Sequence, residues 1–529
     1  MDINQLLLWI VCTSCILNII VGIRRVGMRH SAMYIRSWIW VAGFILVATA
    51  TAYFLIPAKA GLIAGGLWGI FMLVPILGFR LVNQLAITER FGAASQLGNI
   101  LYWLHPIESW HQYSNLLWAL ELIKQGATEQ AERIINRYKS TNSFLSRQTM
   151  ATLYQMEGRW QDLLEWIDTE LPQRILQTDP NLVIYYLRAL GETGQLNRLL
   201  QELKRFELIL EQTDTGVNQN MGRLFAFAFC GQKEQLIRLF KGALAFYPSH
   251  TRQFWLATVN WTAGDKELAR QQFLALSNTS SLFYQNAIQK RLYESLIDPR
   301  RVLTPESRQI LSRLAVDLQH QVRYSGRDRF MGAKAYATWA IIGLNVLMFI
   351  AEVKLGGSQN IYTLYRLGAL VPEDVFNGDW WRLLTSTFLH FGFLHLLMNM
   401  FGLYILGPFV EYALGIGRYL LLYLTTGIGS MLVVCWATEL GYSQAEFVVG
   451  ASGCVMGIVG ATAAILLRGW YREKSRVASK RLQFILFIIA FQVVFDLSNP
   501  EISFTGHTSG LMIGFIVGSL LKADWQGQG

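Results

Sequence analysis

The chain carries little charge for its length. Of its 529 residues only 16% are Asp, Glu, Lys or Arg, whereas hydrophobic residues make up 52%. A soluble protein usually carries about 25% charged residues. This deficit argues against a chain that is water-soluble throughout and favours residence in a membrane.

Cysteine is also scarce, and the cysteines that are present form no metal-binding pattern. The sequence has no CxxC pair and no Cys/His spacing typical of a zinc site, which argues against a structural metal and against a disulfide framework. We therefore expect no metal and no other cofactor. The five cysteines are Cys12, Cys15, Cys230, Cys435 and Cys454.

Long apolar runs account for much of the sequence. A bilayer core requires about 20 mostly apolar residues per helix, and nine runs approach that length, the eighth being short. The first run is preceded by an acidic residue and followed by two arginines, the reverse of a signal peptide, so we expect it to be retained. The predicted spans are 5–23, 37–56, 60–81, 335–353, 393–412, 419–439, 448–467, 482–497 and 504–521.

The basic residues between these runs predict the topology. Lys and Arg gather in residues 24–36, 323–334 and 468–481, while the turns near Ser443 and at 498–503 have none. Threading nine spans places every basic turn on one side, the cytoplasmic side by the positive-inside rule. The N-terminus is then outside and the C-terminus is cytoplasmic, as suits a bacterial plasma membrane. The net charge of +10 thus reflects topology and does not indicate nucleic-acid binding.

The polar segment 83–334 contains a repeat and is predicted to be cytoplasmic. Amphipathic stretches recur with a central glycine every 32 to 37 residues, and a period of about 34 resembles tetratricopeptide repeats. One helix pair cannot bury its own apolar face, so we expect the pairs to stack into a solenoid. Such a solenoid is either a docking surface for a protein or peptide, or a helical spacer without a ligand. The repeat glycines are Gly126, Gly158, Gly194, Gly231 and Gly264.

A final soluble helix is predicted to follow these repeats. It begins in "LTPESRQILSRL", where Thr304 can cap the helix and Pro305 suits its first position.

Polar side chains within or beside the last six runs call for an explanation, because such groups are costly in hydrocarbon. His395 and Asn399 are four residues apart and therefore share a helix face. Ser452 lies among glycines, and His507 begins the last run. Taken singly, the serine is typical of helix packing, and a histidine of structural, metal or proton-path roles.

Two glycine stripes change that interpretation. The stripe that starts at Gly453 follows Ser452, and the stripe at Gly510, Gly514 and Gly518 shares a face with His507. Small residues at such spacing allow two membrane helices to approach closely. Their contact would bring Ser452 within reach of His507, as a serine nucleophile requires of its base.

The same arrangement predicts how a developing negative charge is stabilised. Ser452 lies near the start of its span, where backbone N–H groups are exposed. With His395 and Asn399 these groups could bind an oxyanion, an interaction worth about 2.7–4 kcal/mol per donor. No acidic residue is obviously placed to orient His507, since Asp496 and Glu501 lie near the outer end of the preceding span. We therefore predict a Ser–His dyad rather than a triad.

At these residues the chain resembles the rhomboid intramembrane serine proteases. The matching motifs occur in family order over about residues 335–522, and together they are highly specific. They are Trp381-Arg382, His390 with His395 and Asn399, Gly450-Ala451-Ser452-Gly453, and His507 with Gly510 and Gly514.

The resemblance implies an activity and roles for these residues. Ser452 would be the nucleophile and His507 the base, with His395, Asn399 and the Ser452 N–H forming the oxyanion hole. Gly450 would shape the loop, while His390, Trp381 and Arg382 would be structural. The implied substrates are single-span membrane proteins, cut within the lipid bilayer from a cavity open to the outside, without metal or nucleotide. One position departs from the pattern, because Met456 stands where many members carry an aromatic residue against which the histidine packs.

The sequence as a whole therefore predicts an all-α polytopic membrane protein in three parts. These are three N-terminal spans (1–82), a cytoplasmic tetratricopeptide-like domain (83–334) and a six-span rhomboid domain (335–529). The predicted function is that of an intramembrane serine endopeptidase. The alternatives are a catalytically silent rhomboid-like protein that binds membrane clients, and a proton-coupled transporter. A transporter predicts mid-span carboxylates and a symmetric repeat of spans, which the sequence does not display.

Overall fold

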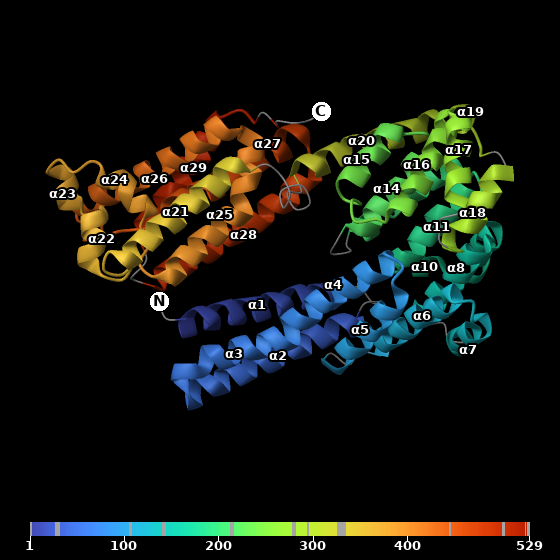
Figure 1. Ribbon diagram of the computed structural model, residues 1–529, viewed down its shortest axis with the longest axis horizontal. Coiled ribbons are helices and arrows are strands. Elements are labelled where there is room, and N and C mark those ends of the chain that lie inside the picture. Colours follow the sequence, from blue (N-terminus) through green and yellow to red (C-terminus); the bar gives the residue numbers. More distant parts are fainter. Residues whose placement is uncertain are drawn as a thin grey trace. The chain divides into compact units, whose positions relative to one another are not determined.

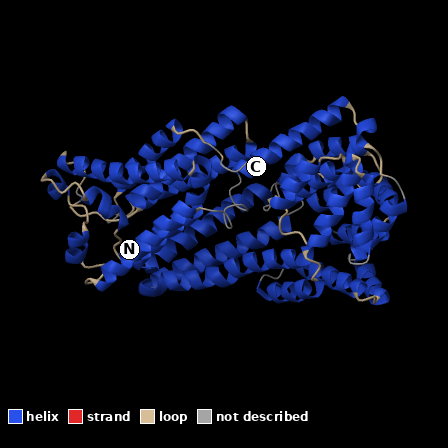
Figure 2. Ribbon diagram, turned by 45° about the horizontal axis from the view of Figure 1, so that its top comes forward, coloured by secondary structure: helices blue, strands red, loops and turns tan. Residues whose placement is uncertain are grey.

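The structure is a computed structural model whose regular elements are helices. Figure 2 shows helices joined by loops in the described residues. The only extended pairing among those residues is an isolated bridge between Leu370 and Val448. The prediction of an all-α protein is confirmed. The structure describes residues 3–26, 32–104, 108–139, 144–211, 216–277, 282–293, 296–324, 335–443, 446–499, 503–523 and 525.

The chain divides into two compact units, residues 1–315 and 316–529. Figure 1 colours the first from blue to yellow-green and the second from yellow to red. The boundary falls within helix α20 (Pro305–Tyr324). The predicted division into three parts at 82 and 334 is a finer one, and it stays a prediction.

Eight helical segments in the described chain are long and apolar enough to cross a membrane. A ninth apolar helix, Phe504–Leu520, has 17 residues. An integral multi-pass membrane protein is the architecture that these lengths support. The eight are Asn4–Ile23, Ser37–Leu55, Pro57–Ile87, Tyr336–Lys354, Phe393–Leu414, Ile416–Glu439, Ser452–Glu473 and Arg476–Leu497.

The three N-terminal spans pack into one apolar cluster. Val11 and Cys15 from the first span meet Ala42 and Ile45 from the second and Met72 from the third, all fully buried. The opposite faces carry large exposed apolar side chains, Trp40 being 78% exposed, as suits lipid contact. The elements are α1 (Ile3–Val26), α2 (Ala32–Leu55), η1 (Pro57–Lys59), α3 (Ala60–Trp68), the π-helical turn η2 (Gly69–Leu73) and α4 (Val74–Ile87).

Helical pairs follow these spans in unit 1, and each repeat glycine lies in the turn within a pair. All five glycines have positive φ, from 70° at Gly158 to 109° at Gly264, a conformation that glycine adopts without steric cost. The pairs are α6 (Glu108–Lys124) with α7 (Thr128–Lys139), α8 (Phe144–Glu157) with α9 (Trp160–Glu165), α11 (Pro180–Glu192) with α12 (Leu196–Arg205), α14 (Val217–Phe229) with α15 (Lys233–Lys241), and α16 (Ser249–Ala263) with α17 (Lys266–Ser277).

The first helices of successive pairs pack on one another, α6 on α8, α8 on α11, α11 on α14, and α14 on α16. This stacking buries one apolar face of each pair against the next. The resemblance to tetratricopeptide repeats stays a prediction. The remaining elements are α5 (Phe91–Leu104), η3 (Trp166–Glu170), α10 (Gln173–Leu176), α13 (Glu207–Glu211), α18 (Leu282–Tyr293) and α19 (Pro299–Val302).

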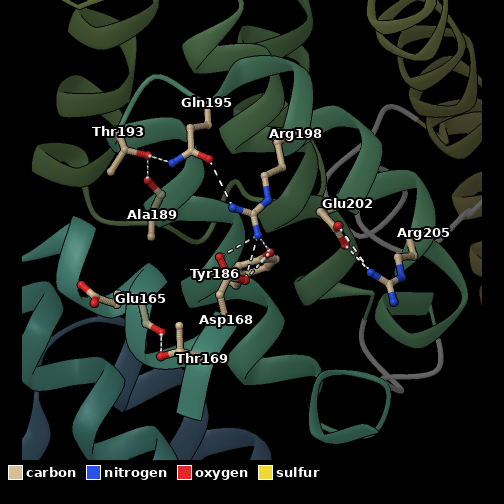
Figure 3. A network of polar contacts seen from close by, with 10 residues as sticks. All are labelled: Glu165, Asp168, Thr169, Tyr186, Ala189, Thr193, Gln195, Arg198, Glu202 and Arg205. Carbon is tan, nitrogen blue, oxygen red and sulfur yellow. Dashed lines mark hydrogen bonds and ion pairs between the residues drawn. The ribbon is translucent and has the colours of Figure 1, made fainter. Parts of the chain in front are cut away.

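Polar side chains tie neighbouring pairs together. Figure 3 shows the Arg198 guanidinium of α12 donating to both carboxylate oxygens of Asp168 in η3, at 2.8 and 2.7 Å, and to the Tyr186 hydroxyl of α11 at 2.6 Å. Deeper in the unit, Arg291 Nη2 lies 3.0 Å from Glu192 Oε2. Burial lowers the pKa of the Arg291 guanidinium, and the Glu192 carboxylate opposes that shift.

The helix predicted at the end of the polar segment is confirmed as α20. Thr304 caps it, because its hydroxyl accepts from the Ser307 N–H at 3.3 Å, and Pro305 is its first residue. Its last residue, Tyr324, lies within unit 2, where its ring contacts Trp525 and its carbonyl accepts from Arg481.

Gly126 offers a clean test of the repeat turns. Its φ is 81° and no heavy atom lies within 4 Å of the position a Cβ would take, so a substitution there changes backbone strain alone. We expect Gly126→Ala to lower the free energy of unfolding by about 1 kcal/mol. Gly126→Asn should cost less, since asparagine tolerates the left-handed conformation. Denaturant unfolding of the two variants measures both values, and equal losses would contradict this origin.

Unit 2 is built around α27 (Ser452–Glu473), most of whose side chains are buried. α25, α26, α28 and α29 each contact α27, and α21 packs on α25. The surrounding elements are α21 (Tyr336–Lys354), α22 (Ile361–Leu367), α23 (Pro372–Phe376), α24 (Arg382–Thr385), η4 (Ser386–Phe388), α25 (Phe393–Leu414), α26 (Ile416–Glu439), α28 (Arg476–Leu497) and α29 (Phe504–Leu520).

The prediction that the eighth span is short is wrong. α28 begins at Arg476 and has 22 residues, because the Ser475 hydroxyl accepts from the Ala478 N–H and caps it. Its first turns carry basic residues, among them Lys480 and Arg481. The apolar run in the sequence begins only after these residues, so it predicted a shorter helix.

Candidate active site

The segment before Ser452 is held to the loop that precedes α25. Leu370 and Val448 exchange two backbone hydrogen bonds, at 2.9 and 3.0 Å, and the Gly450 N–H donates to the Ser386 carbonyl at 2.9 Å. Gly450 has a φ of 133°, a conformation that L side chains rarely adopt. These contacts determine where the chain enters α27.

Ser452 is the first residue of α27 and is partly exposed. Val455 donates the hydrogen bond that opens the helix, to the Ala451 carbonyl at 2.9 Å. The N–H groups of Ser452 and the two residues after it precede that bond, so they face the helix terminus and its positive dipole end. Ser452 thus stands beside backbone donors suited to a developing anion.

The two glycine stripes pack directly on one another. A Cβ at Gly510 would lie 3.1 Å from the Gly453 Cα, and one at Gly514 would lie 2.5 Å from the Gly457 Cα. Farther along, a Cβ at Gly518 would lie 2.8 Å from the Ala461 Cα. This is the contact between α27 and α29 that the sequence spacing predicts, and it leaves no room for side chains along the interface.

His507 lies in the first turn of α29, next to this contact, and is buried with 9% of its surface exposed. The residue before it, Gly506, has its carbonyl oxygen 3.8 Å from where a Gly453 Cβ would be. The neighbours of Ser452 and His507 are therefore in backbone contact.

The structure corrects one prediction about His507. Asp496, near the end of α28, has its Oδ2 2.8 Å from His507 Nδ1 and is 4% exposed. The expectation that no acidic residue is placed to orient this histidine is wrong. The cause is tertiary, because residues 11 apart in sequence face each other from the end of α28 and the start of α29. The other acidic candidate, Glu501, lies outside the described residues.

His395 lies beside the Gly450–Ser452 turn on α25. A Cβ at Gly450 would be 2.7 Å from His395 Nε2 and 3.7 Å from Ser452 Oγ. Asn399, one turn later, is buried, and its amide donates to the His395 carbonyl at 3.2 Å. Of the two predicted side-chain donors, His395 is the one beside the serine, and Asn399 is engaged within its own helix.

His390 packs behind His395. The two rings are 5.2 Å apart in a T-shaped arrangement, and His390 is fully buried. Its backbone N–H donates to Glu352 Oε1 of α21 at 2.9 Å. Sequence reasoning missed Glu352, whose only signal was an acidic residue in an apolar run.

Arg382 organises the loop before α25, whereas its neighbour Trp381 is half exposed. The Arg382 Nη1 donates to the Tyr365 and Ala369 carbonyls, both at 3.0 Å, and its Nε donates to Asp379 at 2.9 Å. Its guanidinium also lies over the Trp381 and Tyr365 rings. These contacts hold α22, α24 and the intervening turns together.

Met456 is buried in the apolar cluster around α27, one turn after Ser452. Its flexible thioether side chain fills space without presenting a flat ring. In the described residues, no group of three or more His, Cys, Asp or Glu side chains could hold a metal ion.

Comparison with known proteins identifies the family. The family model described as the Rhomboid domain matches residues 377–523. YdcA of Bacillus subtilis (strain 168), a protein named for the rhomboid proteases, is 34% identical over 162 residues, which cover 31% of this chain and 74% of YdcA. The chain belongs to the rhomboid family.

Two further relatives match over a smaller share of their own length. Rhomboid protease GluP of Bacillus subtilis (strain 168) is 33% identical over 204 residues, 38% of each chain. RHOMBOID-like protein 6, mitochondrial, of Arabidopsis thaliana is 38% identical over 177 residues, 32% of this chain and 54% of the relative. The chain thus matches about two fifths and about half of these two relatives. Every predicted site residue, from Trp381 to Gly514, lies within the rhomboid match.

Proposed function

We propose that this rhomboid is an intramembrane serine endopeptidase in which Ser452 is the nucleophile and His507 the general base. One observation carries the proposal: α27, which begins at Ser452, packs glycine to glycine on α29 next to His507. Such contact leaves the two polar side chains at one end of a tight, otherwise apolar interface. Family membership supports the same reaction class.

The proposed chemistry is acyl transfer to serine followed by hydrolysis. Ser452 Oγ attacks the carbonyl carbon of the scissile peptide while its proton passes to His507 Nε2. The same proton then goes to the leaving nitrogen as the C–N bond breaks. Water, deprotonated by the freed imidazole, releases the acyl group and restores the serine. This route requires neither metal nor nucleotide, and we propose that the enzyme uses none.

The oxyanion of the tetrahedral intermediate would be bound by the Ser452 N–H and the His395 ring. The position of the His395 ring beside Gly450 supports this role. Asn399 would complete the hole once its amide turns from the His395 carbonyl, because catalytic donors often align only in the reacting complex.

The proposed substrates are single-span membrane proteins whose transmembrane helix unwinds near small or helix-breaking residues. The partial exposure of Ser452 supports access of water and of an extended peptide. The proposed location is a bacterial plasma membrane, with the N-terminus outside and the repeat region and C-terminus cytoplasmic. The distribution of basic turns supports that orientation.

The decisive experiment is cleavage in proteoliposomes. The full chain is reconstituted with a panel of single-span reporters that carry helix-breaking residues, and products are followed by mass spectrometry. We expect one product pair from a cut within or beside the span, and blocked cleavage after treatment with a phosphonate that reacts with activated serines. If no reporter is cut and Ser452 takes up no phosphonate, a catalytically silent client-binding protein becomes the better assignment.

The repeat region is proposed to dock a protein or peptide, with a spacer as the alternative. Deletion of residues 128–302 tests it while keeping α5 and α6, which pack with the N-terminal spans, and the Tyr324 end of α20. We expect reporters to be cut at an unchanged rate and cross-linked partners to be lost. Retention of the same partners would favour the spacer.

A further inference from the structure

A chain of three polar side chains ends on His507. Gln492 Nε2 donates to Asp496 Oδ1 at 2.8 Å, and Asp496 Oδ2 lies 2.8 Å from His507 Nδ1. Gln492 and Asp496 are one turn apart on α28, so they present one polar edge to α29. Each carboxylate oxygen therefore has its own partner, and the carboxylate is held in orientation.

A carboxylate at position 496 is energetically unfavourable for two reasons unless His507 is counted as its partner. A carboxylate in an apolar, membrane-spanning helix is unfavourable unless it is paired. Asp496 is also in the last turn of α28, where the helix dipole disfavours negative charge. Neither burial nor helix stability accounts for an acid at this position, whereas its partner His507 does.

The hydrogen bond determines which ring nitrogen carries the proton. Two groups lie within hydrogen-bond distance of His507 Nδ1: Asp496 Oδ2 at 2.8 Å and the Gln492 amide nitrogen at 3.4 Å. A carboxylate only accepts hydrogen bonds, so the shorter contact favours Nδ1 as the donor. The lone pair is then on Nε2, the nitrogen that must take the serine proton. When the imidazole becomes charged during attack, the adjacent carboxylate stabilises it.

Met456 explains why such support matters in this chain. Where the family resemblance places an aromatic residue against the histidine, this chain has the flexible thioether of Met456, which offers no flat ring to hold an imidazole in one plane. A hydrogen bond from a carboxylate that is itself fixed by Gln492 restricts ring rotation instead.

We propose that Asp496 is a positioning residue for His507, which makes the predicted dyad a Ser452–His507–Asp496 triad with Gln492 as its outer support. The inference rests on the proposed function and deepens it. Asp496 does not touch substrate; it acts through the tautomer and the orientation of the base.

Three substitutions separate this role from a structural one. Asp496→Asn keeps the shape, but its amide donates toward Nδ1 and favours the wrong tautomer. Asp496→Ala removes the carboxylate without imposing a tautomer, and Asp496→Glu keeps the charge at a longer reach. We expect kcat to fall by about 1000-fold in the Asn variant and by about 30-fold in the Ala variant. The Glu variant should keep more activity than either, and KM should change little in all three.

Thermal unfolding of the same variants gives their stabilities, which are then compared with their kcat values. A cavity makes the Ala variant less stable than the Asn variant, so the proposal predicts that kcat and stability rank these two in opposite orders. The matched control is Glu411→Gln, another buried carboxylate of unit 2, which accepts from the Ala337 and Thr338 N–H groups at the start of α21. It should lower the unfolding temperature and leave kcat unchanged.

The outcomes are distinguishable from failure of the proposed function. Full kcat in Asp496→Asn, or kcat values that follow stability across the series, would overturn the triad while wild-type cleavage still supported the protease. An inactive wild type whose Ser452 takes up no phosphonate would overturn the protease and the triad with it.

Discussion

Replacing Ser452 with alanine should reduce reporter cleavage by at least about 10⁴-fold, leaving only the residual rate that the oxyanion hole and substrate binding supply without a nucleophile. The hydroxyl is the only group that forms the acyl-enzyme in the proposed route, so nothing in the remaining site substitutes for it. Substrate binding should persist, because binding depends on the membrane-facing surfaces of the helices rather than on one oxygen. Single-turnover cleavage and reporter cross-linking measure the two quantities separately.

The matched control is Ser509→Ala on α29. Ser509 is another serine in a membrane helix of unit 2; it is buried, and its hydroxyl donates to the Thr505 carbonyl of its own helix at 2.6 Å. We expect this variant to cleave at the wild-type rate. Retained cleavage by Ser452→Ala would show that a different nucleophile acts, and equal loss in both variants would point to general damage by serine removal.

Gly514→Ala should destabilise the protein more than any other glycine-to-alanine substitution in unit 2. The added Cβ would overlap the Gly457 carbonyl oxygen and lie 2.6 Å from its carbon. Backbone cannot rotate away as a side chain can, so α29 must move off α27. We expect a loss of at least about 3 kcal/mol in the free energy of unfolding. Activity should fall as well, because α29 carries His507.

Gly343→Ala in α21 controls for the substitution itself. Gly343 is also a helical glycine of a span, but no heavy atom lies within 4 Å of its Cβ position. This variant should be unchanged or stabilised by up to about 1 kcal/mol. Denaturant unfolding in detergent compares the two proteins. Equal stability of Gly514→Ala and wild type would mean that the glycine faces are not in contact.

Periodic features could be predicted because they depend only on local geometry. The apolar runs predicted helices, some of which begin at the predicted residue, as at Phe393 and Phe504, because helix length must match the bilayer. The glycines of the repeat likewise marked turns, since positive φ is a property of one residue. The start of α28 was missed because its basic first turns broke the apolar pattern that predicted the rest of the helix.

Most of the candidate site could be predicted for a different reason. Ser452 and His507 stand out because polar groups in apolar helices need an explanation, and the glycines after each residue predict which faces meet. Asp496 and Glu352 could not be assigned in this way. Each carries the same polar signal, but nothing in its own helix indicates which partner it contacts.

By itself, therefore, the sequence determined that this protein is an all-helical rhomboid of the membrane, where most of its apolar helices and its repeat turns lie, and which serine and histidine are the candidates for catalysis. Helices, membrane spans and glycine stripes follow from the spacing of residues along one chain, so they can be predicted from the sequence alone. Only the tertiary structure decided that Asp496 faces Nδ1 of His507, that Asn399 bonds within its helix, and that Arg382 braces a loop. Those contacts depend on the distance between elements that pack through space, which no periodicity along the chain encodes.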